Sequence, residues 1–513
     1  MLNIDDLFDH LSRVDTGRPV FTDFAGRTFS RPQFATLTRQ VAGGLEGLGL
    51  TAGSAVSIIG LNSVEFIASF FGAMLAGNVA SPLNIRWSPP EMVHALNDSG
   101  AECLFIDDVF LPMLPALKEN APKLKHVIHI GKENTPEGAI PFADVLTDPI
   151  TLDPARDPDS EAVIVYTGGT TGMPKGVVQT QCSILASVMS MVMADLPAAK
   201  NIMALGMPMF HTIGWSTALQ RLIQREASAV VMPMLRPDLF AAAIEKFGAN
   251  CIGAVPAVLQ ALTLDAHLAP ELREKVIEVV YGASPISEGA LKLVLGVFPN
   301  AQLRQGYGMF EVGMLVFLDH QFHVGDMARI DGAGQVAAPY VKLRIEDEDG
   351  NELPTNTPGE IVFYGPTLMK GYLNQPDATA AVMRNGGLRT GDVGEVDEMG
   401  IVYVRDRMKD MIITGGENVY SAEVERVVST HSDVADVAVI GVPHAEWGEA
   451  VHAVIVPAGE ARLTADQLRE FCKASLAGYK CPLSVSFSDE LPRSAMMKVL
   501  KHELRAKVLE AAA

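Results

Sequence analysis

Lysine and arginine are scarce in this 513-residue chain, and so are cysteines and long apolar runs. The 40 basic residues face 61 acidic ones, which gives a formal net charge of −21 and argues against binding to nucleic acid or to an anionic membrane. The five cysteines show no paired short spacing of a zinc site, and so sparse and odd a set predicts a reducing compartment. The longest apolar stretch, Phe66 to Gly77, has about 12 residues, whereas a helix needs about 20 to cross a bilayer.

The N-terminus also has little positive charge. Its first residues, Met1 to Leu7, are acidic and lack the basic segment that opens a secretory signal peptide. Together with the cysteine usage, this predicts a cytoplasmic protein without a membrane span.

The chain is too long for a single hydrophobic core, so we expect two or more domains. Strand-like apolar runs alternate with helical patterns in the first third of the chain: Ala55 to Gly60 precedes Ser63 to Leu75, and Cys103 to Ile106 precedes Leu111 to Glu119. This alternation predicts α/β layers built on a mostly parallel sheet.

The pattern changes to short alternating strands over residues 340–404. Asp349-Gly350, between Val341–Glu346 and Gly359–Tyr364, indicates a hairpin, and Met399-Gly400 indicates a second turn. We therefore expect a small β-rich subdomain here.

The last hundred residues read as a separate α+β unit. The runs Val434 to Val442 and Val451 to Val456 predict strands, and the sequence Thr464-Ala465-Asp466-Gln467 matches a capping box that opens a helix toward Leu476.

A glycine-rich segment from Tyr166 to Gly176 is the most informative part of the chain. It reads Tyr-Thr-Gly-Gly-Thr-Thr-Gly-Met-Pro-Lys-Gly and follows the apolar run Ala162 to Val165, which predicts a buried strand. Such a loop exposes backbone N–H groups and hydroxyls that cradle phosphate oxygens, and Lys175 adds a positive charge. It is not a Walker A loop, because Pro174 precedes the lysine and a glycine follows it.

Four further elements follow in order along the chain. They are Gln305–Glu311, Gly386–Asp392, Asp406–Asp410 continuing through Gly415–Tyr420, and Leu491–Lys498. Together with the glycine-rich loop they cover most of the chain and resemble the signatures of the AMP-forming adenylating superfamily. That superfamily holds acyl-CoA synthetases, peptide-synthetase adenylation domains, beetle luciferases and a few amide-forming ligases.

This resemblance implies a fold and a reaction. The fold is α/β, with a large N-terminal domain (1–408) of layered α/β subdomains plus the β-rich subdomain, and a small mobile α+β C-terminal domain (409–513). The enzyme joins a carboxylate to ATP, releases pyrophosphate and then transfers the acyl group from acyl-AMP. The C-terminal domain rotates about the hinge Lys409 between the two steps, and Gly415 and Gly416 lie on the acceptor side, where CoA enters.

The resemblance also assigns residues to the nucleotide. The phosphate loop comprises Thr167, Gly168, Gly169, Thr170, Thr171, Gly172 and Lys175, with Thr171 counted as catalytic. The adenine slot has Gly282, Ala283 and Ser284 on one wall and Tyr307 on the other, and Gly306 and Gly308 are further ATP-binding residues.

Four charged side chains in the remaining motifs are expected to bind the ribose, the metal and the α-phosphate. Asp392 accepts the ribose hydroxyls with Arg407 as a second contact, and Glu311 is the expected Mg²⁺ ligand. Lys498 is the expected catalytic cation between the carboxylate and the α-phosphate. Read without the resemblance, Glu311 is a carboxylate after a glycine-rich turn, and Lys498 is a solvated lysine near a basic C-terminus.

The acyl pocket is expected around residues 207–215, which resemble the family's Phe-His-x-x-Gly element. His211 and Trp215 line the acyl channel in this interpretation, although a histidine on an apolar segment is more often a core residue. Met309, Phe310 and Met314 add apolar surface, which favours a hydrophobic acid.

Two positions depart from the family's pattern. Phe310 stands where threonine contacts the α-phosphate, and losing one charged hydrogen bond costs roughly 1.5–3 kcal/mol unless another donor replaces it. Its ring can instead form part of the acyl pocket wall, which the apolar neighbours favour. Met496-Met497 replace the Thr-Gly that commonly precedes the lysine, which predicts a stiffer, more apolar loop around Lys498.

The acceptor of the acyl group stays open between CoA and an amine, which would give an amide. A non-catalytic nucleotide-binding protein is a further alternative, suggested by Phe310 and disfavoured because Glu311, Asp392, Arg407 and Lys498 are all retained. A kinase is excluded because its signatures are missing. The sequence does not identify the acid, and it leaves open whether the protein is a homodimer.

Overall fold

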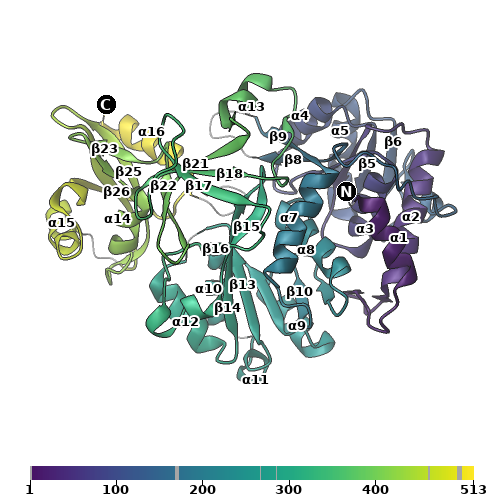
Figure 1. The fold of residues 1–513 in the computed structure, drawn as a ribbon, viewed down its shortest axis with the longest axis horizontal. Coiled ribbons are helices and arrows are strands. Elements are labelled where there is room, and N and C mark those ends of the chain that lie inside the picture. Colours follow the sequence, from purple (N-terminus) through teal and green to yellow (C-terminus); the bar gives the residue numbers. More distant parts are fainter. Residues whose placement is uncertain are drawn as a thin grey trace. The chain divides into compact units, whose positions relative to one another are not determined.

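The protein has a mixed α/β fold, which confirms the predicted fold class. The structure is a computed structural model that describes residues 3–167, 173–265, 267–284, 286–459, 463–493 and 499–512 (Figure 1). Its contacts divide the chain into two compact units. The larger unit comprises 1–283, 293–342 and 363–388, and the smaller comprises 284–292, 343–362 and 389–513.

The larger unit contains an eight-stranded sheet. Its order is β19 (Gly371–Tyr372), β9 (Lys175–Thr180), β8 (Glu161–Thr167), β4 (Val79–Pro82), β3 (Ala55–Ile59), β5 (Cys103–Ile106), β6 (His126–His129) and β7 (Ile140–Pro141). The strands from β8 through β4 and β3 to β7 pair in parallel, whereas β9 pairs antiparallel with both β8 and β19. The predicted parallel layering is therefore present, with an antiparallel edge.

A nine-stranded sheet forms the second layer of the larger unit. Its order is β16 (Gln335–Val336), β15 (Gly313–Leu318), β14 (Gln302–Met309), β13 (Glu278–Gly282), β12 (Cys251–Ala254), β10 (Ile202–Leu205), β11 (Ser228–Val231), β1 (Phe21–Asp23) and β2 (Thr28–Phe29). The centre of this sheet is parallel, and β14 and β15 form an antiparallel hairpin.

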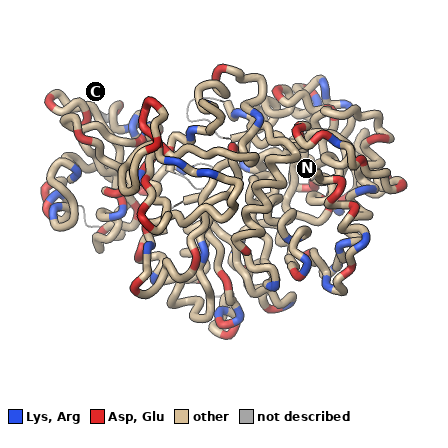
Figure 2. The backbone as a smooth tube through the Cα atoms, in the orientation of Figure 1, with Lys and Arg blue, Asp and Glu red and all other residues tan. Residues whose placement is uncertain are grey.

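Helices alternate with these strands along the chain. They are α1 (Ile4–Arg13), α2 (Arg31–Gly47), α3 (Val64–Leu75), α4 (Pro89–Ser99), α5 (Leu114–Asn120), α6 (Phe142–Val145), α7 (Gln181–Met193), α8 (Thr212–Ile223), α9 (Pro237–Phe247), α10 (Pro256–Leu264), α11 (Pro270–Arg273), α12 (Glu288–Val297) and α13 (Pro376–Val382). The helices α7 and α8 pack against each other and against β15 (Figure 1). Figure 2 shows acidic and basic residues interspersed along the backbone.

Strand β3 is buried on both faces, which explains its continuous apolar sequence. Val56 and Ile58 pack in one hydrophobic cluster with α2, α3, α7 and α8, while Ala55 and Ile59 pack in another with α4 and α5. The predicted strand over 55–60 and the helix that follows it are confirmed, and Ser63 caps that helix by accepting from Phe66 N–H at 3.0 Å.

The helix expected over 111–119 begins later than predicted. A 3₁₀ turn occupies Asp108–Met113 and contains Pro112, and α5 starts only at Leu114. Proline lacks the N–H that an α-helix needs in its interior but is tolerated in its first turn, where Pro115 lies.

A five-stranded sheet has the order β17 (Lys342–Glu346), β18 (Gly359–Tyr364), β21 (Gly387–Val396) and β20 (Met383–Arg384), and β22 (Val402–Arg407) pairs with β21. Both predicted turns are present. Gly350 (φ +88°) and Gly400 (φ +77°) are left-handed and donate to Asp347 O and Asp397 O. The first turn returns the chain only to Glu352, opposite Glu346, so β18 begins after a further loop.

The described residues of the C-terminal part form another five-stranded sheet and three α-helices. Its strands are β23 (Ile412–Thr414), β24 (Glu417–Val419), β25 (Val434–His444), β26 (Gly448–Pro457) and β27 (Ser484–Phe487), and its helices are α14 (Ser421–Val428), α15 (Ala465–Lys473) and α16 (Lys501–Ala512). The predicted strands and the capping box at Thr464 are confirmed. Among the described residues, no helix combines the length and the hydropathy that crossing a membrane requires.

Candidate active site

The glycine-rich segment connects two antiparallel strands. Strand β8 ends at Thr167, which lies opposite Lys175, the first residue of β9. The predicted strand Ala162 to Val165 is confirmed, and its four side chains are buried. Gly168, Gly169, Thr170, Thr171 and Gly172 lie outside the described residues, so their phosphate-binding role stays a prediction.

Helix α4 holds both flanks of this segment. The Tyr166 hydroxyl lies 2.9 Å from Asp98 Oδ2 and 3.2 Å from Ala95 O, and on the other flank His94 Nε2 lies 3.1 Å from Pro174 O. Burial, followed by the nearby Asp98 carboxylate, raises the pKa of Tyr166, so the hydroxyl keeps its proton and donates. Residues near both ends of the glycine-rich segment are therefore bonded to one helix.

Glycines in the predicted adenine motifs are required by close backbone approach. Gly282 and Gly306 pair on adjacent parallel strands, and a Cβ on Gly282 would lie 2.4 Å from Gly306 O. A Cβ on Gly308 would lie 2.0 Å from Gly313 O across the β14–β15 hairpin. Ala283 has φ +68°, a left-handed conformation that is uncommon for alanine and is typical of functional sites.

Tyr307 and Glu311 are carried by the β14–β15 hairpin. The Tyr307 ring is half-buried, with its centroid 6.4 Å from that of Phe363. Glu311 is only 7 % exposed. Its Oε1 accepts from the Tyr372 hydroxyl at 2.8 Å, and its carbonyl accepts from Met369 N–H at 2.7 Å.

Tyr372 is a residue that sequence reasoning missed. The Lys175 ammonium lies 5.5 Å from the centroid of its ring, so Tyr372 contacts a predicted phosphate ligand and the predicted metal ligand. It is 61 residues from Glu311 and belongs to none of the five elements that carried the resemblance. No spacing pattern pointed to it.

In the smaller unit, Asp392 and Arg407 are paired. They lie opposite each other on β21 and β22, with Arg407 Nε 2.7 Å from Asp392 Oδ1. Arg389, in the same motif, does not join them. It forms an ion pair with Glu360, whose carboxylate also accepts from Gly391 N–H at 3.0 Å.

The residues expected around the hinge lie near the surface of the smaller unit. Lys409 is exposed, and Gly415 (φ +59°) and Gly416 (φ +85°) form the tight turn between β23 and β24. Lys498, with Met496-Met497, lies outside the described residues, and its catalytic role stays a prediction.

Two of the predicted acyl-pocket residues are in contact. His211 caps α8, where its Nδ1 accepts from Ile213 N–H at 3.3 Å, and its ring centroid is 4.4 Å from that of Phe310. Phe310 and Met314 are partly buried against the core of the larger unit. Met314 also covers Gly306, where an added Cβ would lie 2.4 Å from its Sδ.

Trp215 lies deeper in that core. It is 2 % exposed and stacks on Phe70, with ring centroids 5.3 Å apart. Met309 is half-buried at the end of β14.

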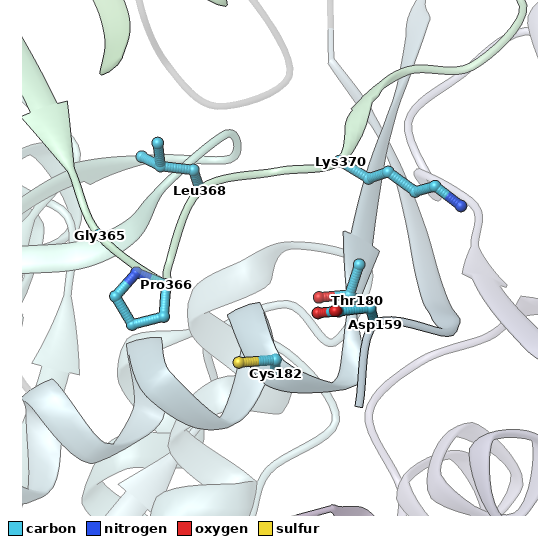
Figure 3. Close-up of a pocket in the computed structure, with 7 residues that line it drawn as sticks. All are labelled: Asp159, Thr180, Cys182, Gly365, Pro366, Leu368 and Lys370. Atoms are coloured by element: carbon cyan, nitrogen blue, oxygen red, sulfur yellow. The ribbon is translucent and has the colours of Figure 1, made fainter. Parts of the chain in front are cut away.

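A surface pocket of about 450 Å³ lies elsewhere in the larger unit and contains none of the predicted site residues (Figure 3). It is lined by Asp159, Thr180, Cys182, Gly365, Pro366, Leu368 and Lys370. In Figure 3 the Lys370 side chain points away from the other lining side chains, and its ammonium pairs with Glu161 at 2.8 Å.

Known proteins resemble the chain over nearly its whole length. Residues 8–373 match the AMP-binding enzyme family, and residues 423–498 match the AMP-binding enzyme C-terminal domain. The chain is 33% identical to fatty acid–[acyl-carrier-protein] ligase ScoC of Streptomyces coeruleorubidus, covering 94% of this chain and 92% of the relative. It is also 33% identical to feruloyl-CoA synthase of an Amycolatopsis species, and the match covers 92% of this chain and 93% of the relative.

Two solved structures share the fold. ATP-bound MatB from Rhodopseudomonas palustris superposes with a TM-score of 0.88 at 28% identity, covering 99% of both chains. The amide bond synthetase McbA from Marinactinospora thermotolerans superposes with a TM-score of 0.87 at 26% identity, covering 98% of this chain and 99% of that one.

Proposed function

Because the chain belongs to the AMP-binding enzyme family, we propose that it activates a hydrophobic carboxylic acid with ATP and then transfers the acyl group to CoA. A carboxylate oxygen attacks the α-phosphorus, the bond to the β-phosphate oxygen breaks, and pyrophosphate leaves. The CoA sulfur then attacks the acyl carbon of acyl-AMP and displaces AMP, while the thiol proton passes to solvent.

One observation in this chain supports the proposal most directly. Lys175, the lysine of the glycine-rich segment, and Glu311, a buried carboxylate, both contact Tyr372. A triphosphate bound with a divalent cation needs a positive side chain and a hard oxygen ligand at one place. The contacts of Tyr372 bring such a pair together.

Mg²⁺ fits the residues around Glu311. Among the described residues, no group of three or more His, Cys, Asp or Glu side chains could hold a metal alone. Mg²⁺ in nucleotide sites is usually bound through one or two carboxylates together with substrate phosphates, and a single oriented carboxylate such as Glu311 meets that need. When bound, the ion would neutralise charge on the triphosphate.

The remaining nucleotide roles follow the motifs. The loop from Thr167 to Gly172 holds the phosphates with Lys175, and Lys498 stabilises the charge that develops at the α-phosphate. The adenine slot is lined by Gly282, Ala283, Ser284 and the Tyr307 ring. Because glycine has no side chain, the backbone at Gly282 can approach the adenine closely. Asp392, oriented by Arg407, accepts the ribose hydroxyls.

We assign Phe310 to the acyl pocket together with His211, Met309, Met314 and Trp215. Its ring contacts the His211 ring, and it packs against the hydrophobic core. This contact supports a pocket wall more than a replacement for a phosphate ligand, because a phenyl ring cannot donate a hydrogen bond to phosphate.

The second step requires a change of conformation in this proposal. The domain boundary lies at 408/409, Lys409 is the hinge, and Gly415 and Gly416 approach the acceptor. The five cysteines are all unpaired, which supports a role in the reducing cytoplasm.

An amine is the second candidate acceptor. The structural likeness to an amide bond synthetase favours it, as does the replacement of Thr-Gly by Met496-Met497 beside Lys498. Amide formation would use the same acyl-AMP, with nitrogen in place of sulfur as the attacking atom.

A carboxylic-acid panel tests both steps. Exchange of radiolabelled pyrophosphate into ATP, dependent on one of the acids, is expected for the first step, and Glu311→Gln should reduce it. Mass spectrometry with CoA, amines or an acyl-carrier protein then identifies the acceptor. Absence of exchange with every acid, in a protein that binds ATP, would refute the adenylation proposal.

A further inference from the structure

Tyr372 is fixed beside the strand that begins with Lys175. It lies on β19 at the edge of the eight-stranded sheet and pairs antiparallel with Val177 of β9. The N–H groups of Lys370 and Leu373 donate to carbonyls of β9 at 2.8 and 2.7 Å. The backbone on both sides of Tyr372 is therefore held in register with β9.

The Tyr372 side chain contacts one acidic and one basic residue. Its hydroxyl donates to Glu311 Oε1 at 2.8 Å, and its ring lies 5.5 Å from the Lys175 ammonium. The same chain segment also holds the backbone of Glu311, because Met369 N–H donates to Glu311 O at 2.7 Å. A single tyrosine thus joins the β14–β15 hairpin to the end of the glycine-rich segment.

Each contact restricts the orientation of a side chain that has several rotamers. The terminal torsion of a glutamate is broad, so a donor bonded to one particular oxygen selects one orientation of the carboxylate. A lysine has a long stem with many rotamers, and the negative face of an aromatic ring attracts its ammonium. The Glu311 carboxylate is buried, so its orientation depends on such protein donors.

We propose that Tyr372 is a positioning residue for the triphosphate and its cation. Its hydroxyl orients the Glu311 carboxylate toward the metal, and its ring places the Lys175 ammonium toward the phosphates. This inference rests on the proposed function, in which Glu311 binds Mg²⁺ and Lys175 binds phosphate. The two contacts are separable, because phenylalanine keeps the ring and leucine keeps neither contact.

Calorimetric titration of ATP into the full-length protein tests the hydroxyl. The measured quantity is the dissociation constant in EDTA divided by that in excess Mg²⁺. Tyr372→Phe should lower this ratio about 10-fold, as expected for one lost charge-assisted hydrogen bond, and should leave the affinity in EDTA unchanged.

The ring contact is tested by a second variant. Tyr372→Leu should lower the ratio similarly and should also weaken ATP binding in EDTA several-fold, because Lys175 loses its ring contact. If Tyr372→Leu binds ATP in EDTA as tightly as Tyr372→Phe does, the assignment of the ring is wrong.

Tyr403→Phe is a matched control. The Tyr403 hydroxyl also donates to a carboxylate, Asp397 Oδ2 at 3.0 Å, at the turn between β21 and β22. Its removal should leave both dissociation constants unchanged. The assignment of the hydroxyl is overturned if Tyr372→Phe matches this control, if it weakens binding equally in both conditions, or if the wild type shows no effect of Mg²⁺.

A double-mutant cycle separates positioning from direct binding. In the Glu311→Gln background, Tyr372→Phe should cause no further fall in the ratio, because the hydroxyl acts only through the carboxylate. A full additional 10-fold fall would overturn the proposal. ATP binding needs no acid or acceptor, so these results stand apart from a failed acid panel, which refutes the proposed reaction alone.

Discussion

Arg407 holds Asp392 from the opposite strand of a β-hairpin. The guanidinium Nε is 2.7 Å from Asp392 Oδ1, and the carboxylate is 4 % exposed while the arginine side chain is 41 % exposed. The arginine therefore reaches a buried carboxylate from the solvent side. The pair fixes the direction of the carboxylate that, in the proposed function, accepts the ribose hydroxyls.

Arg407→Ala should raise the KM for ATP about 10-fold, with a smaller effect on the KM for the acid. The buried Asp392 carboxylate would lose a charge-assisted hydrogen bond that fixes its orientation. Arg405→Ala is the matched control, because Arg405 pairs with Glu395 at 3.0 Å on the same two strands. Steady-state pyrophosphate exchange measures the difference, and equal KM values in the two variants would count against the ribose role.

Lys498→Ala should sharply slow the formation of acyl-AMP and leave thiolysis of supplied acyl-AMP largely intact. In the proposed function the lysine serves the step in which charge develops at the α-phosphate, so only that step should lose stabilisation. Single-turnover measurements of each half-reaction check this. Lys507→Ala, which removes an exposed lysine of α16, should change neither rate. An equal loss in both half-reactions would indicate a structural lysine instead.

Lys409→Pro should slow transfer of the acyl group but not adenylation, the reverse of the effect expected for Lys498→Ala. Proline fixes φ near −65° and should hinder rotation at the hinge, so adenylation continues while transfer to the acceptor slows. Lys409→Ala removes the same charge but leaves the backbone free, and it should transfer normally. Wild-type rates of both half-reactions in Lys409→Pro would mean that the boundary lies elsewhere or that no rotation is needed.

The sequence predicted those features that depend on neighbouring residues. Strand β3, the helix that follows it and the Thr464 capping box follow from local patterns, and the structure confirms them. The family was also identified correctly, because its motifs are short and continuous. Such patterns predict correctly because each depends only on the backbone conformation of neighbouring residues.

Contacts between distant residues were not predictable in this way. Tyr372 meets Glu311 across 61 residues, and Trp215 stacks on Phe70 of another helix. Arg389 lies in a nucleotide motif but pairs with Glu360, on the neighbouring strand β18. Pairing of this kind depends on sheet order and register, which a single sequence does not specify.

Acid should destabilise the larger unit through His323. Its Nδ1 lies 3.0 Å from Asp319 O, which only accepts, so Nδ1 carries the proton and Nε2 accepts from the Tyr281 hydroxyl at 2.8 Å. Burial lowers the pKa of His323 to about 4. Because the unfolded chain binds a proton near pH 6.5, stability is lost as the pH falls from about 6.5 to about 4, by about 3 kcal/mol in all.

His323→Gln isolates this contribution. Glutamine can accept from Tyr281 and donate to Asp319 but does not titrate. The denaturation midpoint of the variant should therefore fall less steeply than that of the wild type as the pH is lowered from 6.5 to 4. Other histidines with a lowered pKa, His320 and His452, contribute to the wild-type slope and are retained in the variant. Identical pH dependence in the two proteins would mean that the pKa of His323 is the same in the folded and the unfolded chain.

Phe310 provides the sharpest test of the acyl pocket. Its ring centroid is 4.4 Å from that of His211, and its backbone carbonyl accepts from Gln179 Nε2. The Phe310 side chain also packs against the hydrophobic core of the larger unit. Phe310→Thr should raise the KM for the acid about 10-fold, since roughly 1–2 kcal/mol of apolar contact is lost, and should leave the KM for ATP unchanged.

Phe310→Leu separates the loss of volume from the loss of the ring. Leucine keeps most of the apolar contact, so its KM for the acid should lie between those of the wild type and Phe310→Thr. If the threonine hydroxyl instead reaches the α-phosphate, Phe310→Thr should lower the KM for ATP and speed adenylation about 10-fold, while Phe310→Leu gains nothing. Measuring both KM values for one good acid decides between the two roles, because a fall confined to ATP excludes the pocket wall and a rise confined to the acid excludes the phosphate contact.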